Sequence, residues 1–194
     1  MVHGPDVRTA LRPALDPHPH PVAAPGDRLA AVLALLVETP SPSLLFTVRA
    51  AGLSRHAGEI SFPGGLQDPG ESLLETAMRE ADEEIGLDAG PVDVLGALPA
   101  VHTHVSGILV VPFVGVVTEE PALTVSAAEI TDVLMFRVAR LGAVETATSY
   151  PRPDGSTWHG WAYELDGHTV WGATGWMLHS LIDRMRREAP WMMG

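Results

Sequence analysis

The sequence predicts one mixed α/β domain, of the α+β kind, in which strands and helices share a single core. Three observations lead to this prediction. The length of 194 residues is typical of one domain. Hydrophobic residues make up 46% of the chain against 19% charged residues, which is the composition of a globular protein rather than a disordered one. Short apolar runs bounded by proline and glycine alternate with two segments of helical periodicity.

The chain begins with a proline-rich arm, residues 1–27, and the globular domain is expected to span residues 28–194. Residues 6–15 predict a short helix that breaks near Pro13, because proline lacks the amide hydrogen that a helix interior needs. Residues 16–27 are rich in proline and glycine, which favours an extended loop.

Five strands and a hairpin turn are predicted from the apolar runs. Residues 29–38 and 44–52 are separated by a proline-containing turn, which favours an antiparallel hairpin. Three later runs also predict strands: residues 92–98, 107–117 and 132–138. Pro112 lies within one of them, which predicts a sheet edge or a bulge there, because proline cannot donate to a ladder.

The last part of the chain predicts a two-stranded element at residues 157–172, followed by a helix at residues 173–188. The helix has apolar residues at a spacing that forms one buried stripe: Trp176, Met177, Leu181 and Met185.

Charge and cysteine content exclude several functional classes. With 12 basic and 24 acidic side chains the net charge is −12, which argues against nucleic acid or an anionic membrane as a partner. The absence of cysteine excludes thiol catalysis and disulfides. No apolar run reaches the roughly 18 residues that span a bilayer, and the N-terminus lacks the apolar core of a signal peptide. We therefore expect a cytoplasmic protein that acts on a small molecule.

Residues 72–86 predict a helix with well-defined ends. Ser72 and Glu75 have the spacing of a capping box, and Gly86 suits the left-handed residue just past a helix end. On a helix of 3.6 residues per turn, one face carries the apolar residues Leu74, Met78, Ala81 and Ile85. Another face carries three carboxylates, from Glu80, Glu83 and Glu84.

The three carboxylates are unfavourable neighbours, because like charges at this spacing cost about 0.2–0.5 kcal/mol per pair. They follow a loop in which Gly64 and Gly65 permit close backbone approach and two prolines add stiffness. A rigid glycine loop beside such a cluster of carboxylates indicates a site for a hard divalent cation. Mg²⁺ and Mn²⁺ take several oxygen ligands and share them with substrate phosphates.

The loop and helix together resemble the signature of the Nudix hydrolases, G-x5-E-x7-R-E-U-x-E-E-x-G-U, where U is aliphatic. Every fixed position is matched, by Gly65, Glu71, Arg79, Glu80, Glu83, Glu84 and Gly86. The resemblance implies a Nudix fold, a mixed β-sheet sandwiched between α-helices with a catalytic loop–helix motif. It also implies hydrolysis of a nucleoside diphosphate linked to another group.

Site roles follow from the same resemblance. Glu80 and Glu84 would bind the catalytic Mg²⁺ or Mn²⁺ directly, Glu83 directly or through water, and the carbonyl of Gly64 would complete the site. Water activated by the cation would attack one phosphorus of the diphosphate. Glu71 and Arg79 would support the site as an ion pair. Gly65 and Gly86 would support it through the backbone of the loop and the helix end.

A second stretch is similar to the coenzyme A pyrophosphatase branch of this family. Residues 45–50, Gly58 and residues 62–65 resemble its motif LLTxR(S/A)-x3-R-x3-G-x3-FPGG, with two departures. Phe46 replaces a leucine, and Ser54 stands where the branch has arginine, with Arg55 one position later. Residues 170–175 are close to the element that opens the last helix of that branch.

This similarity implies cleavage of coenzyme A, its oxidised form or its thioesters to 3′,5′-ADP and 4′-phosphopantetheine or its acyl derivative. Coenzyme A carries a 3′-phosphate, so a cationic side chain is expected to receive it. The candidate substrate-binding residues are Arg49, Arg55 and His56.

The resemblance to Nudix enzymes also implies an additional acid, as base or ligand, in the regions that contain Glu119, Glu120, Glu129 and Glu145. Glu129, just before a predicted strand, is the preferred candidate. Two other functions remain open. One is a Nudix hydrolase of ADP-ribose or NADH, which the Ser54 departure leaves possible. The other is a catalytically silent domain that binds a nucleotide. The oligomeric state is also open, and a homodimer is compatible with the sequence.

Overall fold

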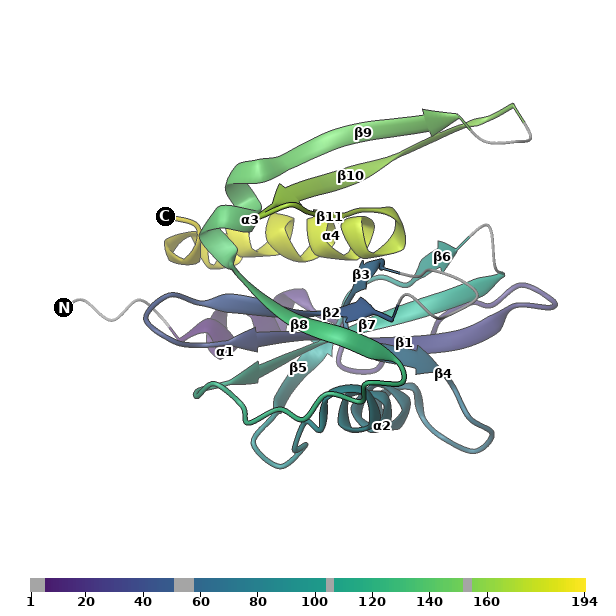
Figure 1. Cartoon of the computed structure of the whole chain (residues 1–194), viewed down its shortest axis with the longest axis horizontal. Helices are drawn as coiled ribbons and strands as arrows, with labels where there is room; N and C mark the ends of the chain where they lie inside the picture. The colour runs from purple at the N-terminus through teal and green to yellow at the C-terminus, as the bar shows by residue number, and fades with distance from the viewer. Residues whose placement is uncertain (1–5, 51–57, 104–106, 152–154) are drawn as a thin grey trace.

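A computed structural model describes residues 6–50, 58–103, 107–151 and 155–194 (Figure 1). The helices are α1 (Val7–Leu11), α2 (Leu73–Ile85), α3 (Val138–Val144) and α4 (Gly172–Glu188), with 3-10 turns at Arg12–Ala14 and Pro190–Met192. The strands are β1 (Arg28–Val37), β2 (Ser43–Arg49), β3 (Ile60–Ser61), β4 (Gly64–Leu66), β5 (Asp93–Ala97), β6 (Val101–Thr103), β7 (Ile108–Val117), β8 (Ile130–Arg137), β9 (Glu145–Pro151), β10 (Thr157–Leu165) and β11 (His168–Val170).

The strands form one large mixed sheet and one small antiparallel sheet. The large sheet has the order β3-β2-β1-β7-β5, with β4 beside β1, β6 beside β7 and β8 beside β2. Strands β1 and β7 run parallel, and the other pairs are antiparallel. Helix α2 covers one face of the large sheet and α4 covers the other, while the sheet β11-β10-β9 lies over α4 (Figure 1). The predicted mixed sheet between helices is therefore confirmed.

Two apolar cores explain why β1 is an uninterrupted apolar run. One core lies between the sheet and α2 and includes Ala31, Leu33 and Leu35 from β1. The other lies on the α4 side and includes Val32, Ala34 and Leu36. Successive side chains of a strand point to opposite faces, so a strand buried on both faces has no polar positions.

The predicted hairpin of the first two strands is confirmed, with Leu36 paired to Leu44. The expectation that Pro112 marks an edge or a bulge is wrong. Strand β7 lies inside the sheet, and Pro112 is paired with Val32 of β1. The carbonyl of Pro112 accepts a hydrogen bond from the amide of Leu98, in the short gap between β5 and β6. The nitrogen of Pro112 faces the same side, where the ladder is already interrupted, so the missing donor costs little.

The last helix confirms the prediction except at Trp176. This side chain is 40% exposed, and its indole nitrogen donates to the carbonyl of His159 in β10. The buried stripe keeps the predicted Met177, Leu181 and Met185 and also includes Leu178 and Ile182.

The N-terminal segment contributes to the core. As predicted, a short helix gives way to a 3-10 turn that contains Pro13. Val7, Leu11 and Leu15 are buried in the core on the α4 side. The division of the chain into an arm, residues 1–27, and a catalytic domain, residues 28–194, stays a prediction. Among the described residues, no helix is both long and apolar enough to cross a bilayer.

Candidate functional site

The glycine loop is fixed against β1 by its backbone. Gly64 and Gly65 pair with Val32 and Ala31. Gly64 has φ +151°, and a Cβ there would lie 2.3 Å from the carbonyl oxygen of Ala31. A Cβ on Gly65 would lie 2.4 Å from the carboxyl carbon of Glu80. Only glycine permits both approaches, so the loop lies directly against the acidic face of α2.

Helix α2 is held at both ends as predicted. The hydroxyl of Ser72 accepts from the amide of Glu75, whose carboxylate accepts from the amide of Ser72. Gly86 adopts the left-handed conformation, and its amide donates to the carbonyl of Asp82 at 2.7 Å. These caps fix the helix register, and so the turn that presents Glu80 and Glu84 to the loop.

Glu84 is the most deeply buried carboxylate of the site, with 2% exposure. Its Oε2 accepts from the amide of Gly64 at 3.2 Å, and Nη1 of Arg49 lies 3.7 Å from Oε1. Burial raises the pKa of Glu84 to about 7, and the nearby carboxylates of Glu80 and Glu129 act in the same direction. The ionised form is therefore poorly compensated by the protein alone.

Glu80 is in a similar position. Burial raises its pKa, although Arg79 opposes this, and Glu83 and Glu129 contribute repulsion. Glu129, in the turn before β8, lies near enough for its charge to raise the pKa of Glu80 and Glu84, and its role as the additional acid stays a prediction. Glu83 lies at the outer side of the cluster, where its side chain is 58% exposed.

Arg79 connects the loop to the helix. Its Nε and Nη2 donate to the two oxygens of Glu71 at 2.7 and 3.1 Å, which holds the pKa of Glu71 down to about 2. Its Nη1 bridges Glu80 and Glu83, at 2.9 and 3.0 Å. This agrees with the predicted supporting ion pair, and it adds contacts to two carboxylates of the cluster.

Thr76 is a supporting residue that the sequence reasoning missed. It is fully buried, and its hydroxyl donates to Glu71 at 2.9 Å, with the carbonyl of Ser72 at 3.1 Å. A threonine on the inner face of an amphipathic helix was the available signal, because a buried hydroxyl needs a polar partner.

The donor set suits a hard divalent cation. Carboxylate oxygens from Glu80, Glu83 and Glu84 and the backbone carbonyl of Gly64 are the ligand types that Mg²⁺ and Mn²⁺ prefer. Burial is the main cause of the raised pKa of Glu80 and of Glu84, with repulsion from neighbouring carboxylates added, and a bound cation would stabilise both ionised forms. Among the described residues, no three acidic or histidine side chains already form a closed metal cluster. Arg79 occupies oxygens of Glu80 and Glu83 instead.

The remaining candidates separate into three groups. Arg49 lies at the site through Glu84, whereas Arg55 and His56 lie outside the described residues. Glu119 and Glu120 are exposed beyond the end of β7. Glu145 lies in the small sheet at the start of β9 and is bonded to Tyr163, His179 and Arg186.

Comparisons with known proteins agree with this geometry. A model of the NUDIX domain matches residues 27–155. An uncharacterized Nudix hydrolase NudL of Photorhabdus laumondii is 34% identical over 175 residues, which cover 88% of this chain and 91% of the relative. A protein of the same name from Cronobacter sakazakii is 37% identical over 159 residues, covering 80% of this chain and 81% of the relative.

Solved structures show the same fold at lower identity. The NUDIX domain of Shewanella oneidensis NrtR, complexed with ADP ribose, has a TM-score of 0.54 at 16% identity, over 84% of this chain and 88% of that one. A MutT/nudix family protein from Enterococcus faecalis has a TM-score of 0.55 at 14% identity, over 88% and 64%. From the family match, the curated relatives and the loop–helix site, the chain belongs to the NUDIX family and is a hydrolase of nucleoside diphosphate derivatives.

Proposed function

We propose that this hydrolase is a coenzyme A pyrophosphatase, which cleaves coenzyme A, its oxidised form or its thioesters to 3′,5′-ADP and 4′-phosphopantetheine or its acyl derivative. The position of Arg49 is the observation that carries this proposal. Arg49 ends the first part of the motif that resembles the coenzyme A branch, and its guanidinium lies 3.7 Å from Glu84. The rest of that motif, Gly58 and residues 62–65, lies on either side of β3. Strand β3 pairs with β2 at Thr47 and Val48, next to Arg49.

The residues of the chain divide into metal-holding, binding and supporting roles. Glu80, Glu83 and Glu84, with the carbonyl of Gly64, would hold Mg²⁺ or Mn²⁺. When bound, such an ion supplies a more acidic water and neutralises charge on the diphosphate. The amide of Gly64 keeps the Glu84 carboxylate oriented toward the loop.

Two side chains of the protein would assist hydrolysis: a general base for the attacking water and a cation that binds a phosphate oxygen. Glu129 is the proposed base, because it is exposed next to Glu80 and Glu84 and is not hydrogen-bonded through its side chain to another described residue. It would take the proton of the attacking water as the new P–O bond forms and the bridging P–O bond breaks. Arg49 would bind a phosphate oxygen, since it is only weakly engaged by Glu84.

Arg55 and His56 remain candidates for the 3′-phosphate on sequence grounds. They follow β2 on the segment that leads from Arg49 toward β3. The chemistry they would recognise is a phosphomonoester, for which a guanidinium is well suited. We further infer a cytoplasmic location and a small-molecule substrate; sedimentation would decide between a monomer and a homodimer.

A second candidate is hydrolysis of ADP-ribose or NADH. Ser54 favours it, because the coenzyme A branch has arginine at that position. The fold is shared with a NUDIX domain that was crystallised with ADP ribose. Recognition of a 3′-phosphate separates the two candidates chemically.

Product analysis tests the proposal. The protein is incubated with Mg²⁺ or Mn²⁺ and with coenzyme A, ADP-ribose and NADH in separate reactions, and the products are resolved by chromatography. Formation of 3′,5′-ADP well ahead of AMP supports the proposal. AMP from ADP-ribose or NADH as the main product would overturn the coenzyme A assignment, and no turnover with either metal would favour a silent nucleotide-binding domain.

A further inference from the structure

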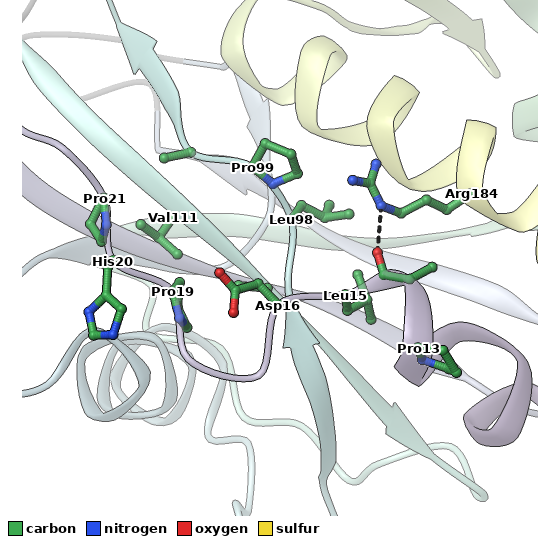
Figure 2. A pocket seen from close by; sticks show the side chains of 13 residues that line it. Pro13, Leu15, Asp16, Pro19, His20, Pro21, Leu98, Pro99, Val111 and Arg184 are labelled. Carbon is green, nitrogen blue, oxygen red and sulfur yellow. Dashed lines mark hydrogen bonds between the residues drawn. The ribbon is translucent and has the colours of Figure 1, made fainter.

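A separate cavity of about 520 Å³ lies between the N-terminal segment, the connection of β5 to β6, and α4 (Figure 2). Its walls come from residues 13–16, 19–21 and 97–100, with Val111 of β7 and Arg184 of α4. None of these residues belongs to the glycine loop or to α2. A volume of this size is in the usual range for small-molecule sites.

The cavity is built from well-fixed backbone. Asp16 and Ala97 exchange two backbone hydrogen bonds, at 2.9 and 2.8 Å, which fasten the N-terminal segment to the edge of the sheet. Nε of Arg184 donates to the carbonyl of Ala14 at 3.0 Å. Prolines and aliphatic side chains form most of the lining: Pro13, Leu15, Pro19, Pro21, Leu98, Pro99 and Val111. Proline walls change little on binding, because their φ angle is fixed.

Arg184 is unusual among the arginines of the described chain. Three other arginines are partly shielded from solvent, and each forms an ion pair: Arg8, Arg49 and Arg79. Arg184 is also partly shielded, but within the described ranges no carboxylate lies within ion-pair distance. Burial and then the charge of Arg187 lower the pKa of Arg184, and Asp183 opposes them only in part, so the permanent charge is incompletely compensated.

One edge of this guanidinium remains available. Nε is used by Ala14, and Nη1 donates to the carbonyl and the hydroxyl of Ser180 at 2.9 and 2.7 Å. Nη2 has no hydrogen-bond partner among the described residues. In Figure 2 the guanidinium points toward Leu98 and Pro99, at the upper side of the cavity.

We propose that this cavity binds a small monocarboxylate, whose carboxylate pairs with Arg184 and whose apolar body lies against the proline and aliphatic walls. A carboxylate supplies the missing counter-ion and a charge-assisted hydrogen bond to Nη2. Asp16 also lines the cavity and selects against a second negative charge on the ligand. A monoanion with an aliphatic chain therefore fits better than a phosphate. The site is independent of the proposed hydrolysis.

Calorimetric titration of the full chain with three probes tests each part of the proposal. Pentanoate carries the charge and the apolar body, pentan-1-ol carries the body alone, and inorganic phosphate carries charge alone. Pentanoate is expected to bind more tightly than either of the others. Equal binding of pentan-1-ol, tighter binding of phosphate, or no binding of pentanoate would overturn the proposal.

Variants locate the binding. Arg184→Met is expected to weaken pentanoate binding about tenfold or more, the value of a charge-assisted hydrogen bond. The matched control is Arg187→Met on the same helix, because Arg187 is exposed and paired with Asp183; it should bind pentanoate like the unmodified chain. Ala100→Trp places a bulky side chain at the exposed rim of the cavity and leaves the Arg184 residue unchanged, so it tests the site even if Arg184→Met folds poorly. Unchanged binding in Ala100→Trp would contradict the location.

Discussion

Two buried glutamates of this chain have opposite environments. Glu145, at the start of β9, has a side chain that is 7% exposed, and Glu84, near the end of α2, is 2% exposed. Burial alone would raise the pKa of Glu145, but hydrogen bonds from Tyr163 at 2.6 Å, from His179 at 2.9 Å and from Arg186 outweigh it and leave the pKa lowered. Burial raises the pKa of Glu84 to about 7.

The difference shows how a structural carboxylate can be told from a functional one. Glu145 is compensated by three donors that also join α4 to the small sheet, so its charge is part of the packing. Glu84 has one amide at 3.2 Å and one guanidinium at 3.7 Å, and it lies beside other carboxylates. A carboxylate that the protein desolvates and leaves poorly compensated is available to a cation.

The largest effect is expected from Glu84→Gln. This change removes a proposed metal ligand and keeps the shape of the side chain, so kcat should fall by about 100-fold or more. The free energy of unfolding without metal should stay the same or rise, because a poorly compensated buried charge is removed. Steady-state kinetics and urea unfolding check both expectations. Loss of stability together with activity would mean that Glu84 is a structural carboxylate like Glu145.

Glu145→Gln should have the opposite effects: a lower free energy of unfolding and a nearly unchanged activity. The neutral amide loses the negative charge that pairs with Arg186 and one of the two oxygens that accept from Tyr163, His179 and Arg186, so we expect a loss of about 2 kcal/mol in the free energy of unfolding. Activity at a temperature where the variant is folded should change little. A large fall in kcat for the fully folded variant would remove the contrast between the two glutamates.

The decrease in the free energy of unfolding at acidic pH should depend on Glu145. Its pKa in the folded state lies below the ordinary value, so its contribution is present above the pKa of the unfolded chain, near 4.5, and is lost as the pH falls through the folded value. The difference in unfolding free energy between the unmodified chain and Glu145→Gln should therefore shrink as the pH is lowered from 7 to below 4. Chemical unfolding at a series of pH values measures it, and a difference that grows toward acid would contradict the lowered pKa.

A smaller effect is expected from Thr76→Val. The change is close to isosteric and removes the hydroxyl that donates to Glu71, the carboxylate that positions Arg79. Outer partners of a metal site are typically worth 10–100-fold in metal affinity or activity, and we expect about tenfold in Mn²⁺ affinity. Thr76→Ser keeps the hydroxyl and should restore most of it. Equal affinities for the valine and serine variants would show that the hydroxyl has no role.

Local patterns in the sequence were sufficient for the site helix and the first hairpin. The capping box, Gly86 and the carboxylate spacing are set within one short segment, so Ser72 to Gly86 could be predicted without the fold. Strand β9 could not, because its sequence ETATSYP has no apolar run and becomes a strand by pairing along β10. Strand β4 could not be predicted for a similar reason. Its two glycines favour a loop, and they adopt a strand conformation because they pair with β1.

Long-range contacts account for the other differences. The position of Trp176 depends on β10, whose carbonyl at His159 receives the indole, and helical spacing alone could not show this. The partners of Glu145 come from β10 and α4, so the sequence could suggest only that it was one of several spare acids. The contact between Arg49 and Glu84 joins β2 to α2 across the glycine loop.

Equilibrium titration with Mn²⁺, followed by electron paramagnetic resonance, tests most directly whether the poorly compensated carboxylate holds the cation. The unmodified chain, Glu84→Gln and Glu145→Gln are compared at neutral pH. The unmodified chain and Glu145→Gln should bind Mn²⁺ alike, and Glu84→Gln should bind at least about tenfold more weakly. Equal binding by Glu84→Gln, or loss of binding in Glu145→Gln while it remains folded, would contradict the distinction between the two glutamates.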